Sequence, residues 1–184
     1  MAADRISFAI LDSPLGELVV GVSSRGCSLV EFVERGGLES IKAWTQRRYG
    51  LEMVERESAL LDTVEEELKS YFRGSLRLFS FPLDLQGTTF EKSVWQQLLA
   101  IPYGQMKTYS DLARLVDKPK AFRAVGRANG SNPLAIVVPC HRVVQTGGGM
   151  GGYGGGIWRK EFLLDLEKQV MLSSDAQRHH LTAE

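Results

Sequence analysis

The first third of the chain is a succession of short apolar runs separated by turn residues. Residues 6–10, 18–22 and 28–32 are rich in Val, Ile, Leu and Phe, and Pro or Gly lies between the runs. Such runs are typical of neighbouring antiparallel strands joined by tight turns. We therefore expect a β-meander at the start of the chain.

Helical spacing of the apolar residues follows. Two helices are predicted near 38–49 and 58–72, and in the second Leu61, Val64 and Leu68 recur at intervals of three and four. Both helices belong to the same unit as the meander.

A connector over residues 75–86 leads to a second unit. Residues 88–91 resemble a capping box at the start of a helix that ends near 102–104. We expect a domain boundary near residues 80–88. This gives an N-terminal α/β structural domain over 1–84, a second domain over 85–170 and a flexible tail over 171–184.

Residues 108–116 and 121–129 predict two short helices across a break. The second is basic and rich in small residues, which makes the pair a helix-turn-helix candidate. Many helical hairpins bind no nucleic acid, so the pattern alone is weak. Small side chains would nevertheless let the second helix approach a groove closely, and Arg123 and Arg127 could reach phosphate or base.

Composition and charge narrow the class of protein. With 43% hydrophobic and 24% charged residues, the balance is that of a soluble globular protein. No apolar run approaches the roughly 20 residues that cross a bilayer, and the first residues do not form a secretion signal. We expect a cytoplasmic location (nucleoid-associated, or nuclear in a eukaryote) and no membrane contact.

The net charge is zero, but the basic residues gather in one stretch. Acidic residues dominate residues 52–69, whereas 107–127 holds six basic residues against two acidic ones. This asymmetry indicates an anionic partner for the second stretch, although two ordinary solvated helix faces would give the same pattern.

Cys140 stands in a setting that favours reactivity. A free buried cysteine is usually a small core residue. Here an apolar run over 134–138, of strand or buried extended character, leads to the cysteine, and His141 and Arg142 follow it. Either neighbour would favour the thiolate. The glycine-rich residues 147–156 could lie against a flat ligand. Adjacent side chains of a strand point to opposite faces, so adjacency alone does not establish a contact between His141 and Cys140.

These motifs together resemble the O6-alkylguanine-DNA alkyltransferases, also called methylated-DNA–protein-cysteine methyltransferases. The resemblance is strong over 85–170 and extends weakly over the N-terminal third, where residues 13–16 resemble the family's opening hairpin. In chain order, it is carried by residues 101–104, 108–110, 123–126, 132–133, 139–144, 153, 159–160 and 163–167.

The resemblance implies an α+β fold. A small N-terminal β-meander or ribonuclease-H-like domain with helices would precede a mostly helical C-terminal domain, which contains the helix-turn-helix and the active-site cysteine. The implied function is DNA repair: an alkyl group moves irreversibly from O6-alkylguanine, or from O4-alkylthymine, to Cys140. Each molecule would act once, as a monomer without a cofactor, on double-stranded DNA contacted in its minor groove.

The resemblance also assigns catalytic roles. Cys140 would be the acceptor, and His141 would act as its base through a water. Glu167 would orient and polarise His141, Asn132 would hold this network and the neighbouring turn, and Tyr109 would give a proton to the leaving guanine. A thiol with a pKa of about 8.5 needs such a base at neutral pH.

The resemblance also assigns contacts to DNA and to the damaged base, which must turn out of the duplex stack to react. Arg123 would fill the space that this base vacates in the stack. The other predicted DNA contacts are Ala121, Ala124, Arg127 and Ala128. The predicted substrate pocket is formed by Tyr153, Gly154, Lys160, Val143 and Pro139.

Two departures from the family pattern and two alternative functions complete the prediction. The N-terminal region has only Cys27 and no histidine, so we predict no zinc, although some relatives carry it. Gly154 replaces the serine that many members have, which would widen or loosen the pocket. Two other functions stay open: a DNA-binding regulator with an inert Cys140, and a cysteine hydrolase that uses Cys140, His141 and Glu167 over many turnovers.

Overall fold

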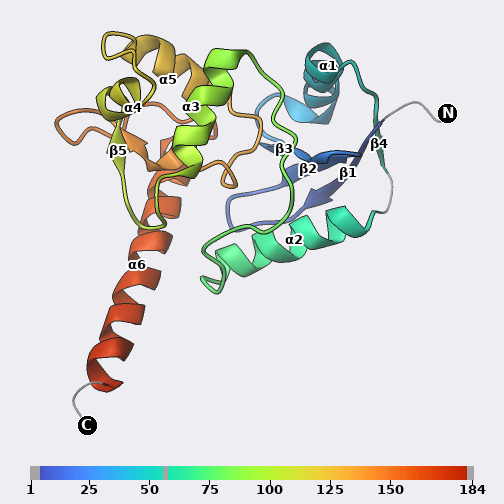
Figure 1. Ribbon diagram of the computed structural model, residues 1–184. Helices are drawn as coiled ribbons and strands as arrows, with labels where there is room; N and C mark the ends of the chain where they lie inside the picture. Colours follow the sequence, from blue (N-terminus) through green and yellow to red (C-terminus); the bar gives the residue numbers. More distant parts are fainter. Residues whose placement is uncertain (1–4, 56–57, 182–184) are drawn as a thin grey trace.

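The N-terminal half is built on a four-stranded sheet in the order β3-β2-β1-β4 (Figure 1). The computed structural model describes residues 5–55 and 58–181. Strands β1 (Ile6–Leu11), β2 (Leu18–Ser23) and β3 (Gly26–Phe32) pair antiparallel, with Ile10 opposite Val19 and Val20 opposite Val30. The predicted meander is therefore confirmed. The short strand β4 (Met53–Glu55), which the sequence did not predict, pairs parallel to β1.

Helices cover both faces of this sheet, and every residue of β2 is buried as a result. Helix α1 (Gly37–Tyr49) packs with Ile41 against one face, in a cluster that includes Val19. Helix α2 (Ala59–Phe72) packs Val64 and Leu68 against the other face, next to Val20 and Val30. Both predicted helices are confirmed.

The C-terminal half is mostly helical, as predicted. Helix α3 (Thr89–Leu99) begins at the expected capping box, and the predicted hairpin is formed by α4 (Tyr109–Leu115) and α5 (Phe122–Gly130). A two-stranded parallel sheet of β5 (Lys107–Thr108) and β6 (Val143–Val144) lies beside them. The one-turn 3₁₀ helix η1 (Cys140–Arg142) precedes β6, and the long helix α6 (Ile157–Leu181) closes the chain.

Helix α6 extends well beyond the rest of the molecule (Figure 1). The segment predicted to be a flexible tail therefore begins inside a helix, and its residues 182–184 lie outside the described part. Whether residues 171–184 are mobile stays a prediction.

The outer edge of β3 joins the two halves. The connector after α2 pairs with it, since the Cys27 N–H donates to the Pro82 carbonyl at 2.8 Å. Further along the same strand, the Val30 N–H donates to Pro133 and the Val30 carbonyl accepts from Ala135, both at 2.9 Å. The sheet edge is covered in this way, and the segment that leads to Cys140 is fixed on it.

One large hydrophobic cluster includes side chains from both halves, among them Val64 of α2, Trp95 of α3 and Leu163 of α6. The predicted domain boundary lies in the connector between α2 and α3. Whether either half folds by itself stays a prediction.

Candidate active site

The segment before Cys140 differs from the predicted strand. Residues 134–138 are buried, but they form consecutive turns in which the Val138 N–H donates to Leu134 at 2.9 Å. The Asn132 side chain holds these turns, because its amide oxygen accepts from the Leu134 N–H at 3.0 Å and its nitrogen donates to Val138 at 2.8 Å. Ile136 has a φ of 72°, a conformation that β-branched residues rarely adopt and that the surrounding bonds must hold.

Cys140 is the first residue of η1, and it is 6% exposed. Burial raises the pKa of its thiol to about 11, although a hydrogen bond from the Asn132 side chain lowers it and the nearby charge of Glu31 raises it further. At neutral pH the resting side chain is therefore a thiol. It needs help to become a nucleophile.

His141 lies fully buried beside Glu167, with 2.9 Å between Nε2 and Oε1. Burial lowers the pKa of the imidazole. Burial alone would raise the pKa of Glu167, but hydrogen bonds from His141 and Arg142 lower it to about 2. A neutral imidazole beside a carboxylate donates through Nε2. Nδ1 then has a free lone pair, and it has no hydrogen-bond partner among the described residues.

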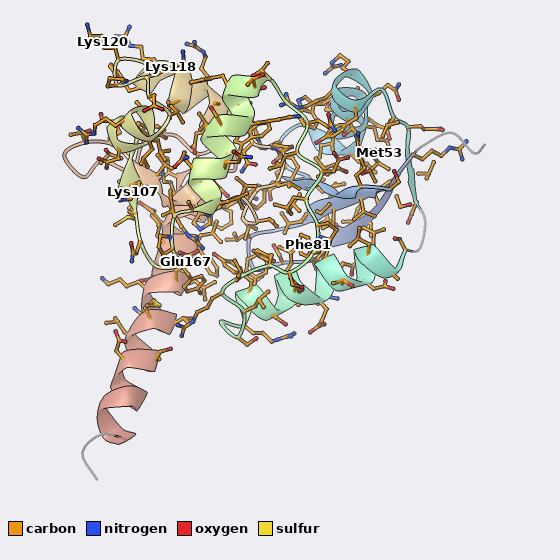
Figure 2. All side chains as sticks on the ribbon, in the orientation of Figure 1. Met53, Phe81, Lys107, Lys118, Lys120 and Glu167 are labelled. Carbon is orange, nitrogen blue, oxygen red and sulfur yellow. The ribbon has the colours of Figure 1, made fainter. Side chains whose placement is uncertain are left out.

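Glu167 is the centre of a larger network than the sequence predicted. Arg142, which we expected to act beside the sulfur, instead donates to Glu167 through Nε and through Nη2 at 2.8 Å. The Tyr71 hydroxyl of α2 donates at 2.8 Å, and the Gly104 N–H donates at 2.9 Å. Figure 2 shows Glu167 where α6 passes the end of α2.

A cavity of about 680 Å³ opens onto the cysteine. It brings together five of the predicted site residues: Cys140, Asn132, Tyr109, Tyr153 and Gly154. Its other lining residues include several that were not predicted as site residues, from β3 and the turn after it (Glu31, Phe32 and Arg35) and from α5 (Phe122, Gly126, Asn129 and Gly130).

The two predicted tyrosines face this cavity differently. The Tyr109 hydroxyl donates to the Gly152 carbonyl at 3.4 Å, and burial, followed by the charge that Cys140 carries once it is a thiolate, raises the pKa of the phenol. The Tyr153 hydroxyl is buried without a partner among the described residues, and burial holds its pKa well above the ordinary value. Both phenols are therefore protonated at neutral pH and can donate a hydrogen bond.

Three predicted pocket residues do not line the cavity. Pro139 borders a small separate hollow, and Val143 is buried in β6. Lys160 is fully buried and donates to the carbonyls of Val143 and Met150, so it holds the loop between them. Burial lowers its pKa to about 8.

Gly154 does not leave empty space, contrary to our expectation of a wider pocket. A Cβ atom at this position would lie 2.7 Å from Nη1 of Arg35. The guanidinium therefore occupies the room that a side chain would take.

The predicted DNA-contacting residues lie on α5 or, in the case of Ala121, at its N-cap, and all but one of them are at least partly exposed. Arg123 and Arg127 are exposed, and Ala121 and Ala124 are half-buried. Ala128 is 3% exposed and packs into the core, so it does not belong to the free face of the helix. Figure 2 shows Lys107, Lys118 and Lys120 on the side of the molecule away from the N-terminal sheet.

No group of three or more His, Cys, Asp or Glu in the described part of the chain is arranged to hold a metal ion. In the same residues, no helix is long and apolar enough to span a membrane.

Comparison with known proteins matches this arrangement to one family. Residues 89–169 match the family model for the 6-O-methylguanine DNA methyltransferase DNA-binding domain. A methylated-DNA–protein-cysteine methyltransferase of Mycobacterium tuberculosis is 40% identical over 163 residues, 89% of this chain and 93% of the relative. That of Methanosarcina acetivorans is 40% identical over 87% of this chain and 97% of its own length.

Solved structures give the same result. The crystal structure of Mycobacterium tuberculosis OGT in complex with DNA is similar with a TM-score of 0.76 and 38% identity, over 89% of this chain and 94% of that one. The cysteine at the mouth of a cavity, the buried histidine and glutamate behind it and the helical hairpin beside it thus occur in a chain similar to these proteins along most of its length. The chain belongs to the methylated-DNA–protein-cysteine methyltransferases, the DNA-repair enzymes that take an alkyl group from DNA onto a cysteine.

Proposed function

We propose that this protein removes the alkyl group of O6-alkylguanine, and of O4-alkylthymine, in duplex DNA by transfer to the sulfur of Cys140. The observation that carries the proposal is the position of Cys140 on the large cavity, next in the chain to a buried imidazole with an unpartnered Nδ1. Each molecule reacts once, because the thioether that forms is stable and the reaction includes no step that restores the thiol. The reaction uses no cofactor.

In the proposed reaction, Sγ of Cys140 attacks the alkyl carbon, and the bond from this carbon to O6 of guanine breaks. The thiol proton passes through a water to Nδ1 of His141, while Glu167 stabilises the imidazolium that forms. Tyr109 donates a proton to the guanine ring as the base leaves, which avoids a guanine anion. His141 and Tyr109 then exchange protons with solvent, so the net change moves one proton from thiol to guanine.

The damaged base must leave the stack to reach Cys140. We propose that α5 lies in the minor groove and that Arg123 fills the vacated space. The exposure of Arg123 and Arg127 supports this, as do Ala121 and Ala124, which allow close approach. Readout in this groove depends little on sequence, which suits a protein that must act at any damaged site. The basic side chains beside the hairpin would contact phosphate.

The test is stoichiometric. The protein is incubated with a duplex that contains one O6-methylguanine, and intact and peptide masses are measured. We expect one methyl group on the peptide of Cys140 and none in Cys140→Ala. Methyl on Cys27, or repaired DNA beside unmodified protein, would overturn the proposal. Repair of many duplexes per protein molecule would point to a turnover enzyme instead.

A further inference from the structure

The wall of the acceptor cavity includes one ion pair, and it comes from the N-terminal half. Among the described residues that line the cavity, only Glu31 and Arg35 carry a charge. Oε2 of Glu31 lies 2.8 Å from Nη1 of Arg35, and Oε1 accepts from the Phe32 N–H at 2.9 Å. Because both carboxylate oxygens are bound, Glu31 holds the guanidinium in one place.

That place is directly against Gly154 of the glycine-rich loop. A Cβ on Gly154 would lie 2.7 Å from Nη1 and 2.9 Å from Cζ of Arg35, closer than non-bonded atoms approach. A side chain at position 154 and the present Arg35 conformation therefore exclude each other. The N-terminal half thus completes a wall that the C-terminal half leaves open.

A second cavity of about 290 Å³ lies on the other side of this ion pair. Glu31 and Arg35 line both cavities, together with Gly130 and Asn132. The pair is therefore part of a partition between them. The Arg35 side chain is 40% exposed, so it can swing into solvent without disturbing the core.

We propose that the Glu31–Arg35 pair limits the size of the alkyl group that Cys140 accepts. Small alkyl groups react with the partition closed, whereas bulky aliphatic groups require Arg35 to leave Gly154 and connect the two cavities. This inference rests on the proposed function. An uncharged alkyl group offers the displaced guanidinium no replacement for its bond to Glu31, so bulky substrates bear the loss of that charge-assisted hydrogen bond.

The experiment compares two duplexes of the same sequence, one with O6-methylguanine and one with O6-(cyclohexylmethyl)guanine. The second group is bulky and has no π face on which a guanidinium could stack. Single-turnover rate constants are measured for the wild type, Arg35→Ala, Glu31→Gln/Arg35→Ala and Arg47→Ala. The double variant removes the carboxylate charge that Arg35→Ala leaves unpaired. Arg47 is the matched control, because it lines the second cavity and not the first.

We expect the ratio of the bulky to the methyl rate constant to rise roughly tenfold in both Arg35 variants, as for loss of one charge-assisted hydrogen bond, and not in Arg47→Ala. Changes in thiol reactivity cancel in this ratio. Unchanged ratios in both Arg35 variants, with methyl transfer intact, would overturn the size limit alone, and so would an equal rise in Arg47→Ala. Absence of methyl transfer in the wild type would instead overturn the proposed function.

Discussion

Burial favours the uncharged form of both Cys140 and His141, and it therefore shifts their pKa values in opposite directions. It raises the pKa of the thiol to about 11 and lowers the pKa of the imidazole. At neutral pH the resting site therefore holds a protonated thiol and an unprotonated base. Both states are those needed just before transfer, and the thiol is protected from reaction until a substrate carbon lies beside it.

The first prediction concerns the base. His141→Ala should lower the single-turnover rate by about 10²- to 10⁴-fold, the usual contribution of a general base. In the wild type, the rate should fall with acidification only below the ordinary histidine pKa of about 6.5, because burial lowers the pKa of His141. The variant should lack this acidic limb, and its rate should rise with pH as the thiolate forms.

Cys27→Ala provides the control for this experiment. Burial raises the pKa of the Cys27 thiol to about 12, and Cys27 is not among the residues that line the cavity. Its removal should leave the pH profile unchanged. An acidic limb that persists in His141→Ala would show that another group is the base.

At the scale of elements, the proposed role of α5 in DNA binding can be tested separately from the alkyl transfer itself. Arg123→Ala on α5 should slow transfer from a duplex by about tenfold or more, since filling the stack offsets part of the cost of flipping. Transfer from free O6-benzylguanine should change little, because no base is flipped. Arg73→Ala, which removes an exposed arginine at the end of α2 that is paired with Glu66, is the control and should leave both rates unchanged. Equal losses on the two substrates in Arg123→Ala would contradict the flipping role.

The contact of α2 with α6 gives a third prediction. Tyr71→Phe removes a 2.8 Å hydrogen bond to Glu167. With one donor fewer, the carboxylate attracts the proton of His141 more strongly, so the acidic limb of the rate profile should move to higher pH. Tyr103→Phe is a matched control, because the Tyr103 ring packs on Tyr71 at 5.9 Å while its hydroxyl has no partner among the described residues. A limb that moves equally in both variants would exclude this positioning role.

Elements with a clear period were predictable, and contacts across long sequence separations were not. The three long strands, the capping box at residues 88–91 and the hairpin followed from local patterns. Residues 134–138 resemble a strand because they are buried and apolar, but the Asn132 side chain folds them into turns. Tyr71 reaches Glu167 over 96 positions. The spacing of residues along the chain predicts neither this contact nor the position of Arg35 against Gly154.

In the whole molecule, the N-terminal half contributes to the site in three ways. The backbone of Val30 fixes the segment before Cys140, the Glu31–Arg35 pair forms a wall of the cavity, and Tyr71 binds Glu167. The half of the molecule that lacks the reactive cysteine thus shapes the turn before Cys140, the pocket and the surroundings of the base. Substitutions in it should alter reactivity and selectivity as well as stability.

Glu167 joins α2, α6, η1 and the loop at Gly104, so its charge should determine how the whole fold responds to acid. Its folded-state pKa of about 2 lies below the ordinary 4.5. It therefore contributes stability above about pH 5 that is lost as the pH falls through 4.5 towards 2. His141 acts in the same direction, because its pKa is lowered from 6.5. It contributes stability above about pH 6.5, and this contribution is lost as the pH falls below 6.5, before that of Glu167, because acid protonates the histidine of the unfolded chain first.

Glu167→Gln should lower the free energy of unfolding at pH 7 by about 3 kcal/mol, because Arg142 is left buried without its partner. It should also flatten the decline between pH 4.5 and 2. Urea unfolding across this range measures both effects. Glu66→Gln, which removes an exposed carboxylate 2.7 Å from Arg73, should change little, and equal losses in the two variants would contradict the central role of Glu167.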